Sequence, residues 1–109
     1  MNTENLKITF ERGILVAKID GDIDHHSAKS IRERIDSVIF ERKPALVLLD
    51  LSAVDFMDSS GLGLILGRFN TAKELGLDLK ILSPSRSVKK VLELAGIERL
   101  IKIEGDYLL

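Results

Sequence analysis

The chain opens with two stretches of strand-like patterning. Leu6, Ile8 and Phe10 alternate with polar residues, and a second apolar stretch covers residues 14–19. Alternation with a period of two is typical of a β-strand that buries one face. Residues 11–13 end in glycine and separate the two stretches, so they can form a tight turn. We therefore predict an antiparallel hairpin at the start of the fold.

Apolar residues then recur at helical spacing in three segments. The first covers residues 27–42 and carries charged residues on its opposite face. The second ends at Gly76, which suits a left-handed helix cap. The third begins at Ser83, a cap residue followed by proline, and stops at Gly96. The apolar positions of the three faces are, in order, Ala28, Ile31, Ile35, Val38 and Ile39; Leu62, Ile65, Leu66, Phe69 and Ala72; and Val88, Val91, Leu92 and Ala95.

The remaining apolar segments predict the other strands. Residues 45–49 are apolar without alternation, as expected for a central strand covered on both faces. Residues 77–81 alternate again, and residues 100–103 fit a last short strand. Because strand-helix-strand crossovers are right-handed and make their strands parallel, we predict an α/β fold. Its mixed, mostly parallel sheet is opened by the antiparallel hairpin, and its helices pack mainly on one face.

Length and composition narrow the function classes. The 109 residues fit one domain, residues 1–109, and 45% apolar with 30% charged residues allow both a core and a polar surface. The net charge is -1, and basic residues have acids beside them, so we expect no direct nucleic acid contact. Cysteine is absent, which excludes disulfides and thiolate chemistry. With a polar start and no apolar run near about 18 residues, we expect a cytoplasmic protein without membrane contact.

The segment from residue 55 to residue 68 is unusual because it places glycines in a predicted helix. Gly61, Gly63 and Gly67 lie in the first turns, where each costs about 1 kcal/mol relative to alanine. Close packing of this helix on the sheet or on the preceding helix is one explanation. The other is that a second molecule approaches this end of the helix. The sequence leaves both explanations open.

Three cap-type residues precede these glycines. Asp58, Ser59 and Ser60 can each accept a hydrogen bond from the amides of the first helical turn, but one cap suffices. At least one serine side chain is then left beside free amide donors and the positive end of the helix dipole. Such a position tolerates a phosphate, and it lies at the carboxyl end of a strand, where open α/β folds place their sites. A phosphorylatable serine fits here.

Two enzymatic or nucleotide-binding interpretations of this segment are weak. A dinucleotide fingerprint that starts at Gly61 and Gly63 needs glycine or alanine at position 66, where Leu66 stands, and no P-loop ending is present. A hydrolase would use Ser59 as nucleophile with a nearby histidine as base. However, the glycine-x-serine-x-glycine pattern is missing because Met57 takes the place of its first glycine.

A pair of histidines precedes the first predicted helix. His25 and His26 lie beside Asp22 and Asp24, which suggests a metal site, but adjacent residues point in different directions and no second ligand cluster follows. We expect neither a metal nor a cofactor. Either Asp24 or Ser27 starts the helix, and the histidines lie at the surface or the edge of the fold.

Two segments together resemble a known family. Residues 56–68, with their aspartate-serine-serine-glycine run, and residues 21–26 before the first helix are similar to the anti-sigma factor antagonists of bacteria, which are single STAS domains. The resemblance runs over nearly the whole chain with the same order of elements. One departure is that family members often continue into a C-terminal helix, whereas this chain stops after residues 104–109.

The resemblance implies a phosphorylation switch in a protein that is not an enzyme. In the family, the first serine of the run is the phosphate acceptor, which is Ser59 here. The unphosphorylated form binds an anti-sigma factor that is itself a serine kinase and so releases the sigma factor. Phosphorylation by that kinase reverses the binding, and a phosphoserine phosphatase restores the serine. The partner surface carries over as Asp24, His25, Asp58, Ser59, Ser60, Gly61 and Leu62.

The family also contains proteins of another kind. STAS domains occur as scaffold components of stress-signalling complexes, so a scaffold is the alternative function. The two roles differ in their partners. The aspartate-serine-serine-glycine run favours the antagonist.

Overall fold

A computed structural model describes residues 5–105 of the protein. Residues 1–4 and 106–109, which include the polar start and most of the chain end noted above, lie outside the described residues. The elements are, in chain order, β1 (Leu6–Glu11), β2 (Ile14–Ile23), α1 (His25–Arg42), β3 (Leu46–Met57), α2 (Ser59–Leu75), β4 (Asp78–Leu82), α3 (Arg86–Leu94), a short 3-10 helix η1 (Ile97–Arg99) and β5 (Lys102–Glu104).

Within the described residues, the strands form one sheet in the order β1-β2-β3-β4-β5. β1 and β2 pair antiparallel, and the other neighbours pair parallel. The predicted hairpin is confirmed, since Glu11 pairs with Ile14 and Gly13 turns the chain with a φ of 80°. β2 extends to Ile23, beyond its predicted end at residue 19, because it keeps pairing with the long strand β3.

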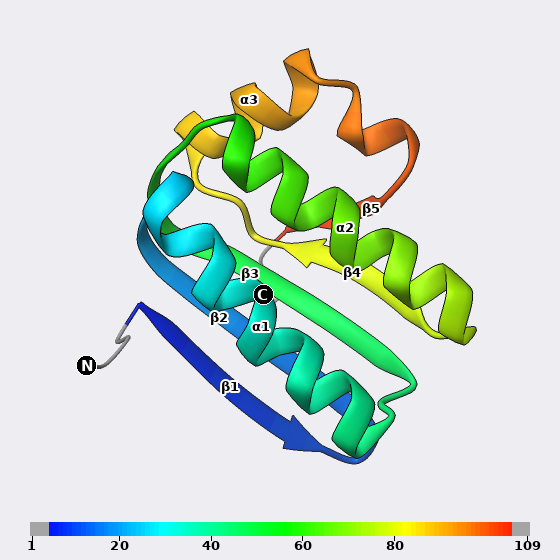
Figure 1. The fold of residues 1–109 in the computed structure, drawn as a ribbon. Helices are drawn as coiled ribbons and strands as arrows, with labels where there is room; N and C mark the ends of the chain where they lie inside the picture. The colour runs from blue at the N-terminus through cyan, green and yellow to red at the C-terminus, as the bar shows by residue number, and fades with distance from the viewer. Residues whose placement is uncertain (1–4, 106–109) are drawn as a thin grey trace.

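The helices cover one face of this sheet. Each parallel crossover moves to the next strand in the same direction, so right-handed connections place α1, α2 and α3 on the same side. Figure 1 shows α1 and α2 side by side across the sheet, with α3 at the end where both of them begin. The predicted fold class, including the helices on one face, is confirmed.

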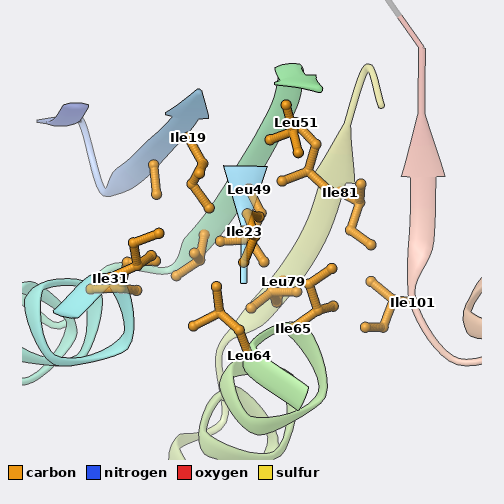
Figure 2. Close-up of a cluster of buried hydrophobic side chains, with 14 of the residues drawn as sticks. Ile19, Ile23, Ile31, Leu49, Leu51, Leu64, Ile65, Leu79, Ile81 and Ile101 are labelled. Carbon is orange, nitrogen blue, oxygen red and sulfur yellow. The ribbon is translucent and has the colours of Figure 1, made fainter. Parts of the chain in front are cut away.

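The core lies between the sheet and α1 and α2. Figure 2 shows Ile31 of α1 and Ile65 of α2 facing strand residues such as Ile19, Leu49 and Ile81. All five side chains are almost completely buried. Burying an aliphatic side chain of this size contributes about 1.5 to 3 kcal/mol, so this layer provides much of the stability of the fold.

The second face of β3 differs from our prediction. β3 is central, but helices cover only the face that carries Val47 and Leu49, which are buried. Leu46 and Leu48 point to the other face and are only half-buried. The apolar run predicts a strand covered on both sides, yet one-way winding leaves one face of the sheet without helices. Here the leucines pack beside apolar neighbours of β2 instead, since Leu48 pairs with Val16.

The start of α3 also differs from the prediction. Ser83 does not cap this helix: its backbone has a positive φ of 48°, and its N–H donates to the Glu104 carbonyl at 2.7 Å. The N-cap is Ser85, two residues later. The serine-proline pair therefore belongs to the loop that joins β4 to α3. β5 likewise occupies Lys102–Glu104 rather than residues 100–103, because η1 and the bend after it use the preceding residues.

The buried face of α2 is rotated relative to the predicted face. Ile65 and Ala72 are buried as expected, but Leu64 and Arg68 are buried too, whereas Leu62 is only half-buried. The reason is that α2 packs against α1 as well as the sheet, so its contact surface is wider than one apolar stripe. Gly76 ends the helix in a left-handed conformation with a φ of 73°, as predicted.

An ion pair joins the two neighbouring helices. Arg68 Nε of α2 lies 2.8 Å from Asp36 Oδ1 of α1, and the Arg68 side chain is only 6% exposed. The N–H is not aligned with the carboxylate, so the attraction comes from charge rather than from a well-formed hydrogen bond. Burial lowers the pKa of Arg68, and Asp36 opposes that shift. The sequence patterns gave no sign of this pair.

Candidate functional site

The starts of α1 and α2 lie next to each other at the carboxyl edge of the sheet. Ile23 and Met57 pair as the last residues of two parallel strands, and each is followed by one cap residue and then a helix. The Asp58 N–H donates to the Ile23 carbonyl at 3.3 Å, which joins the two connections. The structure therefore brings the predicted partner-binding residues, Asp24, His25 and residues 58–62, to one edge.

Asp24 is the residue that caps α1. Its Oδ1 accepts from the His26 N–H at 2.9 Å and from the Ser27 N–H at 3.1 Å. In return, the Asp24 N–H donates to Ser27 Oγ at 3.1 Å, which completes a capping box. The bond from the Ser27 N–H lowers the pKa of the Asp24 carboxyl, and the His26 bond adds to this effect. Of the two predicted starts, Asp24 is the correct one, and α1 begins two residues before the predicted Ser27.

Asp58 caps α2, but without a capping box. Its Oδ1 accepts from the Ser60 N–H at 2.8 Å, and its carbonyl accepts from the Gly61 N–H at 2.9 Å. The aspartate thus caps the helix without using either serine hydroxyl. Ser59, the first residue of the helix, is exposed, and its hydroxyl has no hydrogen-bond partner among residues 5–105. The serine side chain that does not take part in the cap is therefore exposed to solvent.

The neighbours of Ser59 are placed differently. Ser60 and Leu62 are half-buried, and Gly61 is buried. A Cβ atom on Gly61 would lie 2.7 Å from the Met57 sulfur and 3.3 Å from Ile23 Cγ2, which is too close for a side chain. For this glycine the packing explanation is correct: it lets α2 start directly against the end of the sheet.

Packing does not explain the other two glycines of α2. A Cβ atom on Gly63 or Gly67 would meet no heavy atom of the described chain within 4 Å. Gly63 is exposed, and Gly67 is half-buried. Packing inside the domain therefore does not require glycine at either position. The explanation that a second molecule approaches stays open for them.

The end of β3 that leads to Ser59 is fixed by α3. The Ser85 hydroxyl donates to the Val54 carbonyl at 2.7 Å, and the Ser87 hydroxyl donates to the Asp55 carbonyl at 3.1 Å. These bonds satisfy carbonyl groups beyond the point where β4 stops pairing with β3. They connect α3 to the strand that presents the serine, a role that sequence patterning does not show.

The histidines lie in the first turn of α1 rather than in a loop. Both are exposed, with ring centroids 5.9 Å apart. Across residues 5–105, no group of three or more histidine, aspartate or glutamate side chains is placed to hold a metal ion. In that same part of the chain, neither His25 nor His26 hydrogen-bonds to Ser59, as a nucleophile and its base would.

Phe56 is a surface residue that the sequence patterns did not assign to the site. It is 53% exposed, and it pairs with Asp22 at the end of β2, three residues before Ser59. Side chains alternate along a strand, so the burial of Met57 turns Phe56 outward. Phenylalanine is among the aromatic residues that are enriched in protein–protein interfaces. Two adjacent apolar residues just before a helix cap were the signal that could have identified it.

This fold and this edge define a class: a one-sided α/β domain that presents a serine at the start of its second helix. The sequence profile of the STAS domain matches residues 5–107. The chain therefore belongs to the STAS domain family. Within residues 5–105, no helix is both long enough and apolar enough to cross a membrane.

Within this family, similar proteins include antagonists of anti-sigma factors. The chain is 34% identical over 101 residues to the anti-sigma F factor antagonist of Paenibacillus polymyxa, which covers 91% of this chain and 86% of the relative. The anti-sigma factor antagonist SpoIIAA in its unphosphorylated form superposes with a TM-score of 0.79 at 29% identity, covering 90% of this chain and 86% of that one. The phosphorylated form of SpoIIAA, a Bacillus cell fate determinant, gives a TM-score of 0.72 at 28% identity, with 90% and 89% covered. The predicted resemblance is confirmed, and the relatives are regulatory proteins.

Proposed function

We propose that this protein is an anti-sigma factor antagonist whose binding is switched off by phosphorylation of Ser59. The observation that carries the proposal is the exposed Ser59 hydroxyl, left without a partner in the described chain because Asp58 caps the helix. In the unphosphorylated state, the edge around Ser59 binds an anti-sigma factor that is a serine kinase. The sigma factor is then released. A phosphoserine phosphatase returns the protein to the binding state.

The physical basis of the switch is charge at one point. A phosphate adds about -1.5 to -2 charges, more than the net charge of -1 of the whole chain. On its own domain the phosphate lies at a helix N-terminus, where an anion is favourable by about 0.3 to 1 kcal/mol when exposed. The fold is therefore expected to stay intact. Binding weakens because a dianion in the interface must lose its water and face the acidic residues of a kinase active site.

The surroundings of Ser59 strengthen this effect. Asp24 and Asp58 cap the two helices, and Asp22 and Asp55 are exposed at the ends of β2 and β3. A partner that binds this edge must have a surface that is electrostatically compatible with four carboxylates and has space for the neutral hydroxyl of Ser59. Adding a phosphate increases the negative charge where the partner approaches most closely. In this proposal the domain is a substrate of the kinase, acts in the cytoplasm and contacts no nucleic acid itself.

The direct test is phosphorylation by the anti-sigma factor kinase encoded in the same genome. Wild type and Ser59→Ala are incubated with kinase, ATP and magnesium, and the intact masses are measured. The proposal expects one added phosphoryl group on wild type and none on Ser59→Ala, with Ser60→Ala behaving as wild type. Phosphate on Ser60, or equal modification of both proteins, contradicts it. Co-purification with large assemblies in place of a small kinase would favour the scaffold function.

A further inference from the structure

A groove runs between α1 and α2 beside the proposed switch residue. It has a volume of about 330 Å³ and is lined by His25, Lys29 and Arg32 of α1 and by Ser60, Gly63 and Leu64 of α2. The groove starts at Ser60, directly after Ser59, and extends along both helices away from the sheet edge. A partner that covers Ser59 therefore has this groove within reach.

The charged side chains that line the groove are all basic. Lys29 is exposed and has no ion-pair partner among residues 5–105. Arg32 has one long contact, 3.9 Å from its Nη2 to Glu33 Oε2, and both of these side chains are largely exposed. An exposed ion pair at that distance contributes little to stability, so most of the positive charge of Arg32 stays available to a partner.

Gly63 is a second, independent indication that a partner molecule binds in the groove. It lies inside α2, where glycine costs about 1 kcal/mol relative to alanine, and it lines the groove. Within the described chain no atom comes near the place of its missing Cβ, so the domain itself gains nothing from the glycine. A glycine at this position keeps the groove open and allows close approach to the backbone of α2.

The charge of the groove is opposite to the charge of the neighbouring carboxyl edge of the sheet. The carboxylates of Asp22, Asp24, Asp55 and Asp58 cluster around the strand ends, whereas the basic side chains lie on the helix side of Ser60. A partner that binds a surface with an acidic region and a basic region needs the opposite charges at the matching places. This complementarity also fixes the orientation in which the partner docks. The partner must then place negative charge in the groove.

We propose that the α1–α2 groove, lined by His25, Lys29, Arg32 and Gly63, binds an acidic segment of the partner protein. This inference rests on the proposed function, since the partner is the same anti-sigma factor kinase. Aspartate or glutamate side chains of the kinase pair with Lys29 and Arg32, while its active site reaches Ser59. The groove acts as a second contact that positions the kinase and gives the complex part of its salt dependence.

The test is charge reversal with a matched control. Binding of the kinase is measured by calorimetry for wild type, for Lys29→Glu with Arg32→Glu, and for Lys90→Glu with Arg99→Glu, a pair of exposed residues on α3 and η1 with the same change in net charge. We expect the groove variant to bind about 10- to 100-fold more weakly at low salt and to show a flatter salt dependence. The control pair stays within about twofold of wild type, and circular dichroism checks that both variants fold.

The outcomes separate this inference from the proposed function. If wild type binds the kinase and the groove variant binds equally well or more tightly, the acidic-segment inference is wrong while the switch proposal stands. If wild type itself does not bind, the proposed function fails first. Gly63→Ala provides a second variant that leaves the charges unchanged. We expect several-fold weaker binding from it despite a more stable helix, and unchanged affinity would argue against close approach in the groove.

Discussion

The backbone of Gly61 packs against the side chain of Met57, so closely that a Cβ atom on residue 61 would lie 2.7 Å from the Met57 sulfur. Met57 ends β3 and is buried, and Gly61 lies in the first turn of α2. This contact sets how near the start of α2 comes to the sheet. It thereby places Ser59, two residues earlier, at the exposed corner between strand and helix.

Replacement of Gly61 by alanine is expected to destabilise the domain. Overpacking of a filled site costs about 1 to 3 kcal/mol, whereas alanine gains at most about 1 kcal/mol in helix propensity. We expect a net loss of about 1 kcal/mol in the free energy of unfolding, measured in urea. Gly63→Ala is the matched control, because no described atom meets its Cβ, and it should gain up to about 1 kcal/mol. Equal effects of the two changes would contradict the packing role of Gly61.

Phe56 is expected to contribute to binding rather than to stability. Its ring is 53% exposed, three residues before Ser59, so Phe56→Ala should lower the free energy of unfolding by only about 1 kcal/mol or less. As an aromatic anchor in the interface, its loss should weaken kinase binding about 10- to 100-fold. Phe40→Ala is the control, since Phe40 is 57% exposed near the opposite end of α1. Similar affinities of the two variants would exclude Phe56 from the interface.

The pair of Arg68 and Asp36 is expected to couple α1 to α2. Removing the arginine leaves a partly buried carboxylate and a cavity, so Arg68→Ala should lose about 2 to 4 kcal/mol of stability. Arg68→Met together with Asp36→Leu should recover most of that loss, because well-packed apolar side chains often replace a buried ion pair at little cost. Urea unfolding of the single and double variants measures the coupling. Purely additive effects would show that the two charges act independently.

Asp24 is expected to make the stability depend on pH. Hydrogen bonds from Ser27 and then His26 hold the pKa of its carboxyl below the ordinary value of 3.8. A carboxyl with a lowered folded pKa stabilises the fold above its unfolded pKa and loses that contribution as the pH falls through the folded value. Asp24→Asn keeps a cap but has no charge to lose. From about pH 5 to about pH 3, wild type should lose more stability than this variant, and parallel curves would contradict the assignment.

The sequence predicted the parts of the fold that local chemistry determines. The cap at Gly76 and the hairpin turn at Gly13 follow from the conformations that glycine prefers, whereas the structure chooses Asp58 among three possible caps of α2. The position of the start of α2 at the carboxyl end of a strand also followed, whereas the grouping of that start with Asp24 and His25 was implied only by the resemblance to the family. The position of Ser59 was thus predictable from the sequence. Only the structure shows that its hydroxyl does not take part in the helix cap.

Other features depend on contacts between distant segments. Ser83 looks like a helix cap, yet its N–H bonds to Glu104 of β5, and no local pattern contains that bond. Leu46 and Leu48 look fully buried in sequence, but the side on which the helices pack leaves them half-exposed. Arg68 carries a charge that usually marks a surface, so its burial against Asp36 could not be inferred from spacing.

The charge state of Ser59 is what decides binding in this account, and the affinity of four forms for the kinase tests that directly. Calorimetry is carried out with wild type, Ser59→Ala, Ser59→Asp and wild type phosphorylated to completion. We expect wild type and Ser59→Ala to bind alike, and the phosphorylated form to bind at least about 100-fold more weakly, a loss of about 2.7 kcal/mol or more. Ser59→Asp should lie between them with an unchanged circular dichroism spectrum. Equal affinity of the phosphorylated and unphosphorylated forms would contradict the switch.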